Sequence, residues 1–142
     1  MANNDVALPQ AEVSVTVPFH DIDLMGVAWH GHYTKYFEIA RCALLDTFSY
    51  NYREMKNSGF IWPIVEIKIR YPKSVRLDQK LIVRARLVEY EMRLKILYDI
   101  RDAATDERLT KGHTIQVAVD ATTGELLMNS PPILYEKLGL IR

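Results

Sequence analysis

The spacing of apolar residues changes once along this chain, and the change limits the folds that the chain can adopt. From residue 32 to 48 apolar side chains recur every three or four positions, the period of an amphipathic helix. Beyond Gly59 the period becomes two, which is typical of strands that bury one face. One long helix followed by a run of strands predicts an α+β domain. The expected buried face of the helix comprises Tyr33, Phe37, Ala40, Leu44 and Phe48.

The expected elements follow from these periods and from turn residues. Residues 1–11 are polar and are expected to form a flexible N-terminus, which leaves 12–142 as a single domain of ordinary size. A short connection near Glu91 predicts a hairpin. Shorter helices are expected at 52–56 and 133–138. Strands are expected at residues 12–17, 60–71, 80–91, 93–102, 109–120 and 125–128.

The number of strands has a consequence for assembly. One helix cannot cover both faces of so long a sheet, so the sheet is expected to wrap the helix. Long apolar strand edges favour association when they are left unpaired. We therefore expect a homo-oligomer, a dimer or a dimer of dimers.

Composition narrows the classes of function. Lysine and arginine total 18, as do aspartate and glutamate, so no net field favours nucleic acid. No apolar run approaches the roughly 20 residues that a membrane helix needs, and the start lacks the pattern of a signal peptide. The only cysteine, Cys42, fits a reducing compartment. We expect a cytoplasmic protein without nucleic-acid binding or membrane insertion.

The segment "FHDIDLMGVAWHGHYTKYFE", residues 19–38, concentrates the polar residues that could carry chemistry. Asp21, Asp23, His30 and His32 are all residue types that ligate divalent metals. However, two histidines spaced H-x-H at a helix start point apart, and no cysteine reinforces the set. We therefore expect no metal and no cofactor. Cys42 has no evident histidine partner and is interpreted as a small core residue rather than a nucleophile.

The stretch "DIDLMGVAWHGHYTKYFEIAR" resembles the signature of the 4-hydroxybenzoyl-CoA thioesterase-like hotdog family, and of its acyl-CoA thioesterase branch associated with the Tol-Pal system. That signature reads roughly D-x-D-x-x-G-[IV]-[VAL]-[YFW]-H-x-x-Y-x-x-[YF]-x-E. The resemblance implies a hotdog fold, an antiparallel sheet of five to six strands around one long central helix. It matches at Asp21, Asp23, Gly26, Val27, Ala28, Trp29, His30, Tyr33, Tyr36 and Glu38.

The resemblance also implies an activity and a set of roles. A thioester is already activated, so its hydrolysis needs a carboxylate and a donor for the developing oxyanion. By this likeness Asp23 is the catalytic carboxylate, either general base or nucleophile. Backbone N–H groups at Trp29 and His30 polarise the carbonyl, and the His30 side chain is a second catalytic candidate. The expected substrate-binding residues are Met25, Gly26, Val27, Trp29 and Tyr33.

The substrate would be an acyl-CoA or an acyl carrier protein, and both place anionic groups near the site. Candidate cations for those phosphates are Lys68, Arg70, Lys73 and Arg76, with Arg84 and Arg86 as alternatives. Solvated sheet edges explain the same charges equally well. The acyl group stays open among aryl, short-chain and long-chain types.

Two other functions fit the same fold. A 3-hydroxyacyl-thioester dehydratase or hydratase would use a histidine and a carboxylate, and a non-catalytic module would only bind the thioester. The spacing favours hydrolysis, because the acid at Asp23 precedes the helix-start histidine His30 by seven residues, as in the thioesterases.

Overall fold

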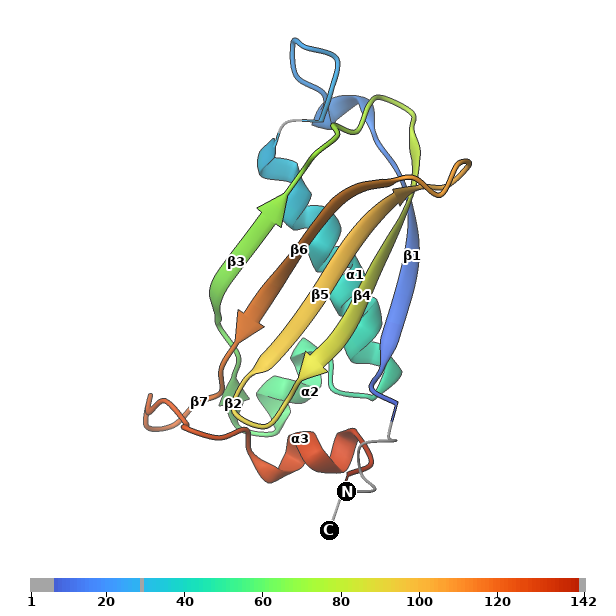
Figure 1. Ribbon diagram of the computed structural model, residues 1–142. Helices are drawn as coiled ribbons and strands as arrows, with labels where there is room; N and C mark the ends of the chain where they lie inside the picture. The colour runs from blue at the N-terminus through green and yellow to red at the C-terminus, as the bar shows by residue number, and fades with distance from the viewer. Residues whose placement is uncertain (1–6, 29, 141–142) are drawn as a thin grey trace.

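The computed structural model describes residues 7–28 and 30–140. A five-stranded antiparallel sheet, in the order β1-β4-β5-β6-β3, curls around the long helix α1 (Tyr33–Thr47) (Figure 1). This arrangement confirms the predicted α+β class and the single central helix. The strands are β1 (Gln10–Thr16), β3 (Ile64–Arg70), β4 (Lys80–Glu89), β5 (Leu94–Asp102) and β6 (Arg108–Gln116).

Smaller elements complete the described chain. A two-stranded sheet pairs β2 (Phe60–Ile61) with β7 (Val119–Asp120). Helices α2 (Tyr52–Asn57) and α3 (Pro132–Lys137) lie at the end of the molecule where β4 and β5 are joined (Figure 1). Two 3₁₀ turns, η2 (Phe19–Asp21) and η3 (His30–His32), lie between β1 and α1.

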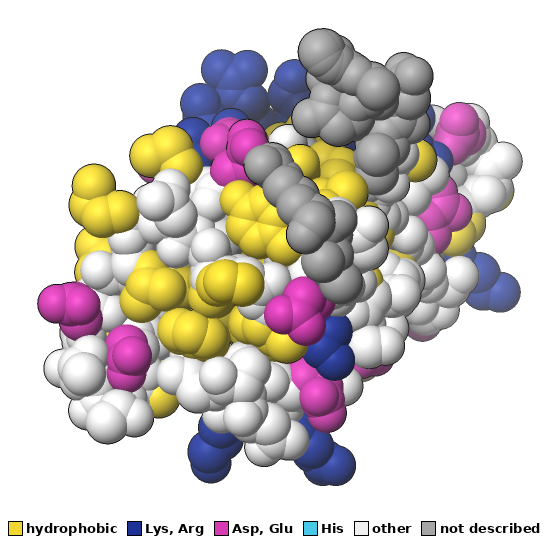
Figure 2. All heavy atoms as spheres, turned by 90° about the horizontal axis from the view of Figure 1, so that it is seen from below, with side chains coloured by type: hydrophobic (Ala, Val, Ile, Leu, Met, Phe, Trp, Pro, Cys, Tyr) yellow, Lys and Arg dark blue, Asp and Glu magenta, His cyan; other side chains and the backbone are white. Residues whose placement is uncertain are grey.

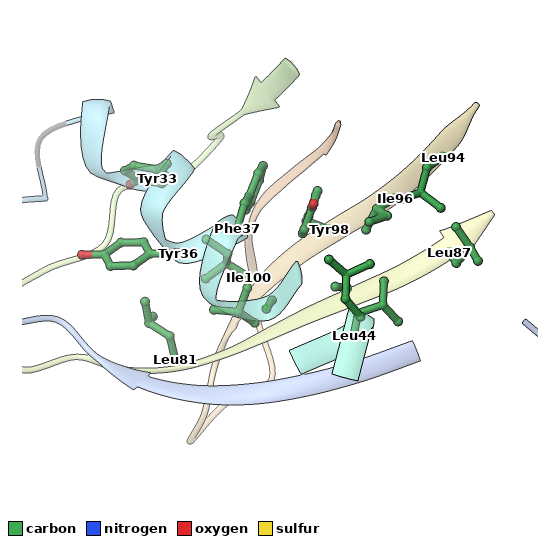
Figure 3. Close-up of a cluster of buried hydrophobic side chains, with 14 of the residues drawn as sticks. Tyr33, Tyr36, Phe37, Leu44, Leu81, Leu87, Leu94, Ile96, Tyr98 and Ile100 are labelled. Atoms are coloured by element: carbon green, nitrogen blue, oxygen red, sulfur yellow. The ribbon is translucent and has the colours of Figure 1, made fainter. Parts of the chain in front are cut away.

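The core fills the space between α1 and the inner face of the sheet. All five residues predicted on the buried helix face are buried, and alternate residues of β4 and β5 meet them (Figure 3). The Phe37 ring stacks on Tyr98 of β5, with centroids 4.3 Å apart and an interplanar angle of 6°. Gly112 lies opposite Tyr98 in β6. A Cβ at Gly112 would fall 2.8 Å from the Phe37 ring and 2.2 Å from a β3 backbone oxygen, so this stack requires glycine.

Two predicted strands are each divided in the structure. The strand expected at 60–71 is interrupted at Trp62 and Pro63, because proline has no N–H to donate to a ladder. The strand expected at 109–120 breaks at the same level, where Val117 N–H donates to the Pro63 oxygen over 3.3 Å. The chain thereby leaves the main sheet for the β2–β7 pair. The expected strand at 125–128 is reduced to one bridge, between Val119 and Leu126.

The N-terminal boundary also differs from the expectation. β1 begins at Gln10, and the Pro9 oxygen accepts a hydrogen bond from Leu87 N–H over 3.1 Å. Part of the segment expected to be flexible therefore pairs with β4. Arg41 departs from the helix pattern as well: the predicted buried face does not include it, but it is 4% exposed and donates hydrogen bonds to the Tyr52 and Tyr98 hydroxyls.

Among residues 7–28 and 30–140, no helix has both the length and the apolar character needed to cross a membrane.

Candidate active site

The loop between β1 and α1 reverses direction over residues 23–27. Asp23 N–H donates to the Val27 oxygen over 3.0 Å, and Gly26 N–H donates to the Asp23 oxygen over 3.0 Å. Gly26 adopts φ +80°, a conformation that side chains disfavour, so the turn depends on this glycine. The tip exposes Leu24 and Met25 almost completely.

A second segment, at residues 75–76, holds this loop against the start of α1. Ala28 N–H donates to the Val75 oxygen over 2.8 Å, and Val27 forms a bridge with Arg76. Val75 N–H in turn donates to the Tyr33 hydroxyl over 3.1 Å. The loop, the helix start and this segment are therefore fixed to one another by backbone groups and by the Tyr33 hydroxyl.

Asp23 is half-buried within the reversed loop. Its Oδ1 accepts hydrogen bonds from Met25 N–H at 2.8 Å and from Val27 N–H at 3.5 Å. In the described part of the chain no donor is bonded to the other oxygen, Oδ2. A carboxylate oriented through one oxygen, with the second directed elsewhere, suits a general base or a nucleophile.

Asp21, two residues earlier, is enclosed instead. Lys35 Nζ lies 2.6 Å and 2.7 Å from its two carboxylate oxygens, and the Tyr36 hydroxyl donates to Oδ2 over 2.7 Å. Nitrogens of His20 and His32 lie 3.7 Å from Oδ1. Burial raises the pKa of the Asp21 carboxyl, but the hydrogen bonds from Lys35 and Tyr36 outweigh burial and hold the pKa below its usual value.

The structure separates the other residues predicted for the site. Met25 lies at the exposed tip, whereas Tyr33, predicted to contact substrate, is 2% exposed and packs edge-on against Tyr71. Burial makes Tyr33 a core residue beneath the loop. His30 begins the turn η3 that leads into α1. Trp29 lies outside the described residues.

Within residues 7–28 and 30–140, no group of three or more histidine, cysteine, aspartate or glutamate residues is placed so that it could hold a metal ion.

The four cations predicted for phosphate binding do not form one group. Lys68 and Arg70 lie on the outer face of β3, where they line a cavity with residues of β4, β5 and β6. Lys73 is paired with Glu107. Arg76 lies beside Val27, next to the loop. Sequence reasoning missed this separation, because the register between strands decides which charges meet.

Comparisons with known proteins identify relatives of this chain. The family described as the thioesterase-like superfamily matches residues 17–138. A Synechocystis sp. protein named "Putative esterase sll0410" is 30% identical over 132 residues, covering 92% of this chain and 80% of that protein.

Two solved structures show the same fold. A DHNA-CoA thioesterase from Staphylococcus aureus is 25% identical, has a TM-score of 0.76, and is matched over 84% of this chain and 80% of that one. Slr0204, a 1,4-dihydroxy-2-naphthoyl-CoA thioesterase from Synechocystis, is 17% identical with a TM-score of 0.81, over 92% and 96% of the two chains.

A five-stranded antiparallel sheet curled around one long helix is the hotdog fold, which these solved thioesterase structures share. The predictions of a hotdog fold and of an enzyme are therefore confirmed. The chain belongs to the thioesterase-like superfamily and hydrolyses acyl thioesters.

Proposed function

We propose that this protein hydrolyses acyl-CoA to a free acid and CoA, with Asp23 as the catalytic carboxylate. The observation that carries the proposal is the Asp23 side chain, which two backbone N–H groups orient through Oδ1 alone. The names of the similar structures support CoA as the carrier. The motif residues support membership of the acyl-CoA thioesterase branch associated with the Tol-Pal system. We also propose a cytoplasmic location, which the single cysteine, Cys42, supports because it fits a reducing compartment.

The reaction follows from these groups. As a general base, Asp23 takes a proton from water while the water oxygen attacks the thioester carbon. Backbone N–H groups at Trp29 and His30 donate to the carbonyl oxygen, which becomes negative. The first N–H groups of a helical segment lack internal partners and favour such charge. The C–S bond then breaks, and the CoA thiolate leaves and takes up a proton. As a nucleophile, Asp23 would itself attack the thioester carbon, break the C–S bond with loss of the CoA thiolate, and form a mixed anhydride. Water then opens the anhydride to the free acid and regenerates the Asp23 carboxylate.

The acyl group would lie against the loop tip. Met25, Gly26, Val27 and Trp29 would line this part of the site, and Tyr33 would support it from below through its bond to Val75. Aryl acyl groups are the first to test, because both similar thioesterases are named for naphthoyl-type substrates.

We also propose that two copies assemble across β3. This strand forms one edge of the sheet, and its side chains Ile64, Val65 and Ile67 are exposed. An unpaired apolar edge favours a second strand. Apolar side chains also gather at the end of the molecule that carries α3 (Figure 2), which leaves room for a dimer of dimers. Val65→Lys is expected to lower the sedimentation coefficient to that of a smaller species, and an unchanged coefficient would exclude β3 as the interface.

A panel of aryl, short-chain and long-chain acyl-CoA and acyl-carrier thioesters, followed by thiol release, tests the substrate class. We expect release from acyl-CoA, with His30→Ala lowering kcat about tenfold, since the backbone N–H survives that change. Excess chelator is expected to leave the rate unchanged. Release from carrier-protein thioesters alone would overturn the choice of CoA.

A further inference from the structure

The outer face of the sheet, which points away from α1, carries an ordered array of cations. Strand register places the side chains in two rows that cross β4, β5, β6 and β3. Neighbouring strands lie about 4.8 Å apart, and the two rows about 6.8 Å apart. One row is Arg86, Leu97, His113 and Lys68, and the next is Arg84, Asp99, Lys111 and Arg70.

These side chains surround a cavity of about 400 Å³. Arg108, at the start of β6, also lines this cavity. The volume lies in the range of small-molecule sites, about 300–1,000 Å³. A hollow of this size fits a compact ligand better than a flat protein surface.

The positive charge of this cation pocket is only partly neutralised. Arg84 pairs with Glu12, and His113 pairs with Glu66 at 2.6 Å. Within residues 7–28 and 30–140, no carboxylate lies within 4.0 Å of five further cations. Those five are Lys68, Arg70, Arg86, Arg108 and Lys111.

The array also costs stability. Arg70 lies directly opposite Lys111 in the ladder, and like charges in that position are destabilising. Asp99 lies opposite Lys111 on the other side and offsets part of this cost, but its carboxylate is paired with Arg101. The chain as a whole has a net charge of zero, so a generally basic composition does not explain the cluster. Residues that oppose local stability are expected where they serve a ligand.

We propose that this cation pocket binds a small molecule that carries two or more phosphate groups. Guanidinium and ammonium groups on four strands can approach several phosphate oxygens at once. A second copy of this chain docked through the same face would place cations against cations, so the charge disfavours an interface between two copies here. Two sources share the ligand chemistry: the nucleotide end of an acyl-CoA, which rests on the proposed function, and a separate nucleotide.

Direct binding tests the pocket without reference to catalysis. Calorimetric titration with pyrophosphate and with ADP is expected to show binding to the unmodified protein. The double variant Arg70→Gln/Lys111→Gln should weaken that binding about 10- to 100-fold, since each charge-assisted contact is lost. The control Arg53→Gln/Lys56→Gln removes the same charge from exposed positions on α2 and should bind as the unmodified protein does.

A stability readout separates ligand binding from a structural role. In the single variant Arg70→Gln, relief of the Arg70–Lys111 repulsion leaves Asp99 opposite Lys111 and is expected to raise Tm by about 1–3 °C in low salt without ligand. A lower Tm, or equal loss of binding in both double variants, would overturn the proposal. So would the absence of pyrophosphate and ADP binding to the unmodified protein at millimolar concentration.

Kinetics then identify the source. If the pocket holds the substrate's nucleotide, Arg70→Gln/Lys111→Gln raises KM for acyl-CoA about tenfold and leaves hydrolysis of an N-acetylcysteamine thioester unchanged. If the ligand is a separate nucleotide, KM for acyl-CoA stays constant while ADP binding is lost. If no thioester is hydrolysed, the proposed function is wrong. The titrations with pyrophosphate and ADP still show whether the cation pocket binds phosphate groups.

Discussion

Asp21 and Asp23 stand two residues apart in the same loop and differ in exposure and in what holds them. The Asp21 side chain is fully buried and receives hydrogen bonds from the side chains of Lys35 and Tyr36. Asp23 is half-buried and, among residues 7–28 and 30–140, its carboxylate accepts hydrogen bonds only from backbone N–H groups of its own turn. Both side chains are carboxylates, but the surroundings of Asp21 suit a structural role and those of Asp23 suit a catalytic role.

The difference shows that one acid of this loop stabilises the fold and the other is available for catalysis. The two side chains that bind Asp21 belong to the first turn of α1, so this carboxylate fastens the loop to the helix. Asp23 depends on a turn with Gly26 and contributes no bond to another element of the described chain. A carboxylate engaged on every side cannot accept a proton readily, whereas a carboxylate held from one side can.

The largest expected effect is on catalysis at Asp23. Asp23→Asn should lower kcat about a thousandfold, because a neutral amide is neither base nor nucleophile. Its side-chain oxygen can still accept from Met25 N–H, so the free energy of unfolding should change by less than about 1 kcal/mol. Thiol release and urea denaturation measure the two quantities. A rate within threefold of the unmodified enzyme would remove Asp23 from the mechanism.

Asp21→Asn should act mainly on stability. We expect the free energy of unfolding at pH 7 to fall by about 2–3 kcal/mol, because the amide weakens two charge-assisted hydrogen bonds and leaves the Lys35 ammonium without its partner. Lys35 is 41% exposed in its side chain, and solvation of the ammonium keeps the loss moderate. Urea denaturation checks this value. Equal stability of the two proteins would contradict the fastening role.

The pH dependence of stability also tests whether the ionised Asp21 carboxylate stabilises the fold. Since folding lowers the pKa of Asp21, its contribution is complete above the unfolded value of about 3.9 and is lost as pH falls through the lower folded value. The stability difference between the unmodified protein and Asp21→Asn should therefore be constant from about pH 5 to 7 and shrink below about pH 4. Denaturant midpoints across that range measure it, and a difference that grows on acidification would reverse the sign.

Tyr36→Phe should have a smaller effect, because it removes one of the donors to Asp21 and leaves Lys35 in place. We expect a loss of about 1–1.5 kcal/mol in unfolding free energy. Thermal unfolding gives the value. In the double variant with Asp21→Asn the two losses should not add, since both changes act on one hydrogen-bond network.

The smallest effect is expected at His20. Its side chain is 78% exposed and its nitrogen lies 3.7 Å from Asp21, so His20→Ala should change stability by less than about 0.5 kcal/mol. The same denaturation experiment serves. A loss as large as that of Asp21→Asn would mean that the histidine, rather than Lys35, holds the carboxylate.

Much of this arrangement could be predicted from the sequence. The period of three to four placed Phe37, Ala40 and Leu44 in the core, because helix geometry alone brings those positions to one face. The same local rule failed for Arg41, whose burial depends on hydroxyls from α2 and β5. Pro63 divides a strand that alternation alone predicted to be continuous. Local periodicity does not specify partners that are distant in the chain.

The cations show the same limit. Alternation places Arg84 and Arg86 on one face of β4, and Lys68 and Arg70 on one face of β3. Only the register across β5 and β6 brings the two pairs around one cavity. Lys73, close to Arg70 in sequence, instead pairs with Glu107.

By itself the sequence determined the class of fold, the central helix and the loop in which the chemistry is expected, because these depend on the spacing of side chains along the chain and on a local motif. The tertiary structure alone decided which acid is buried and which charges share a cavity. Asp21 is enclosed because Lys35 and Tyr36 reach it from α1, whereas one oxygen of Asp23 receives no hydrogen bond from the described residues because the donors of its turn bond the other oxygen. Those assignments depend on distances between segments far apart in sequence, which are fixed only when the sheet closes around the helix.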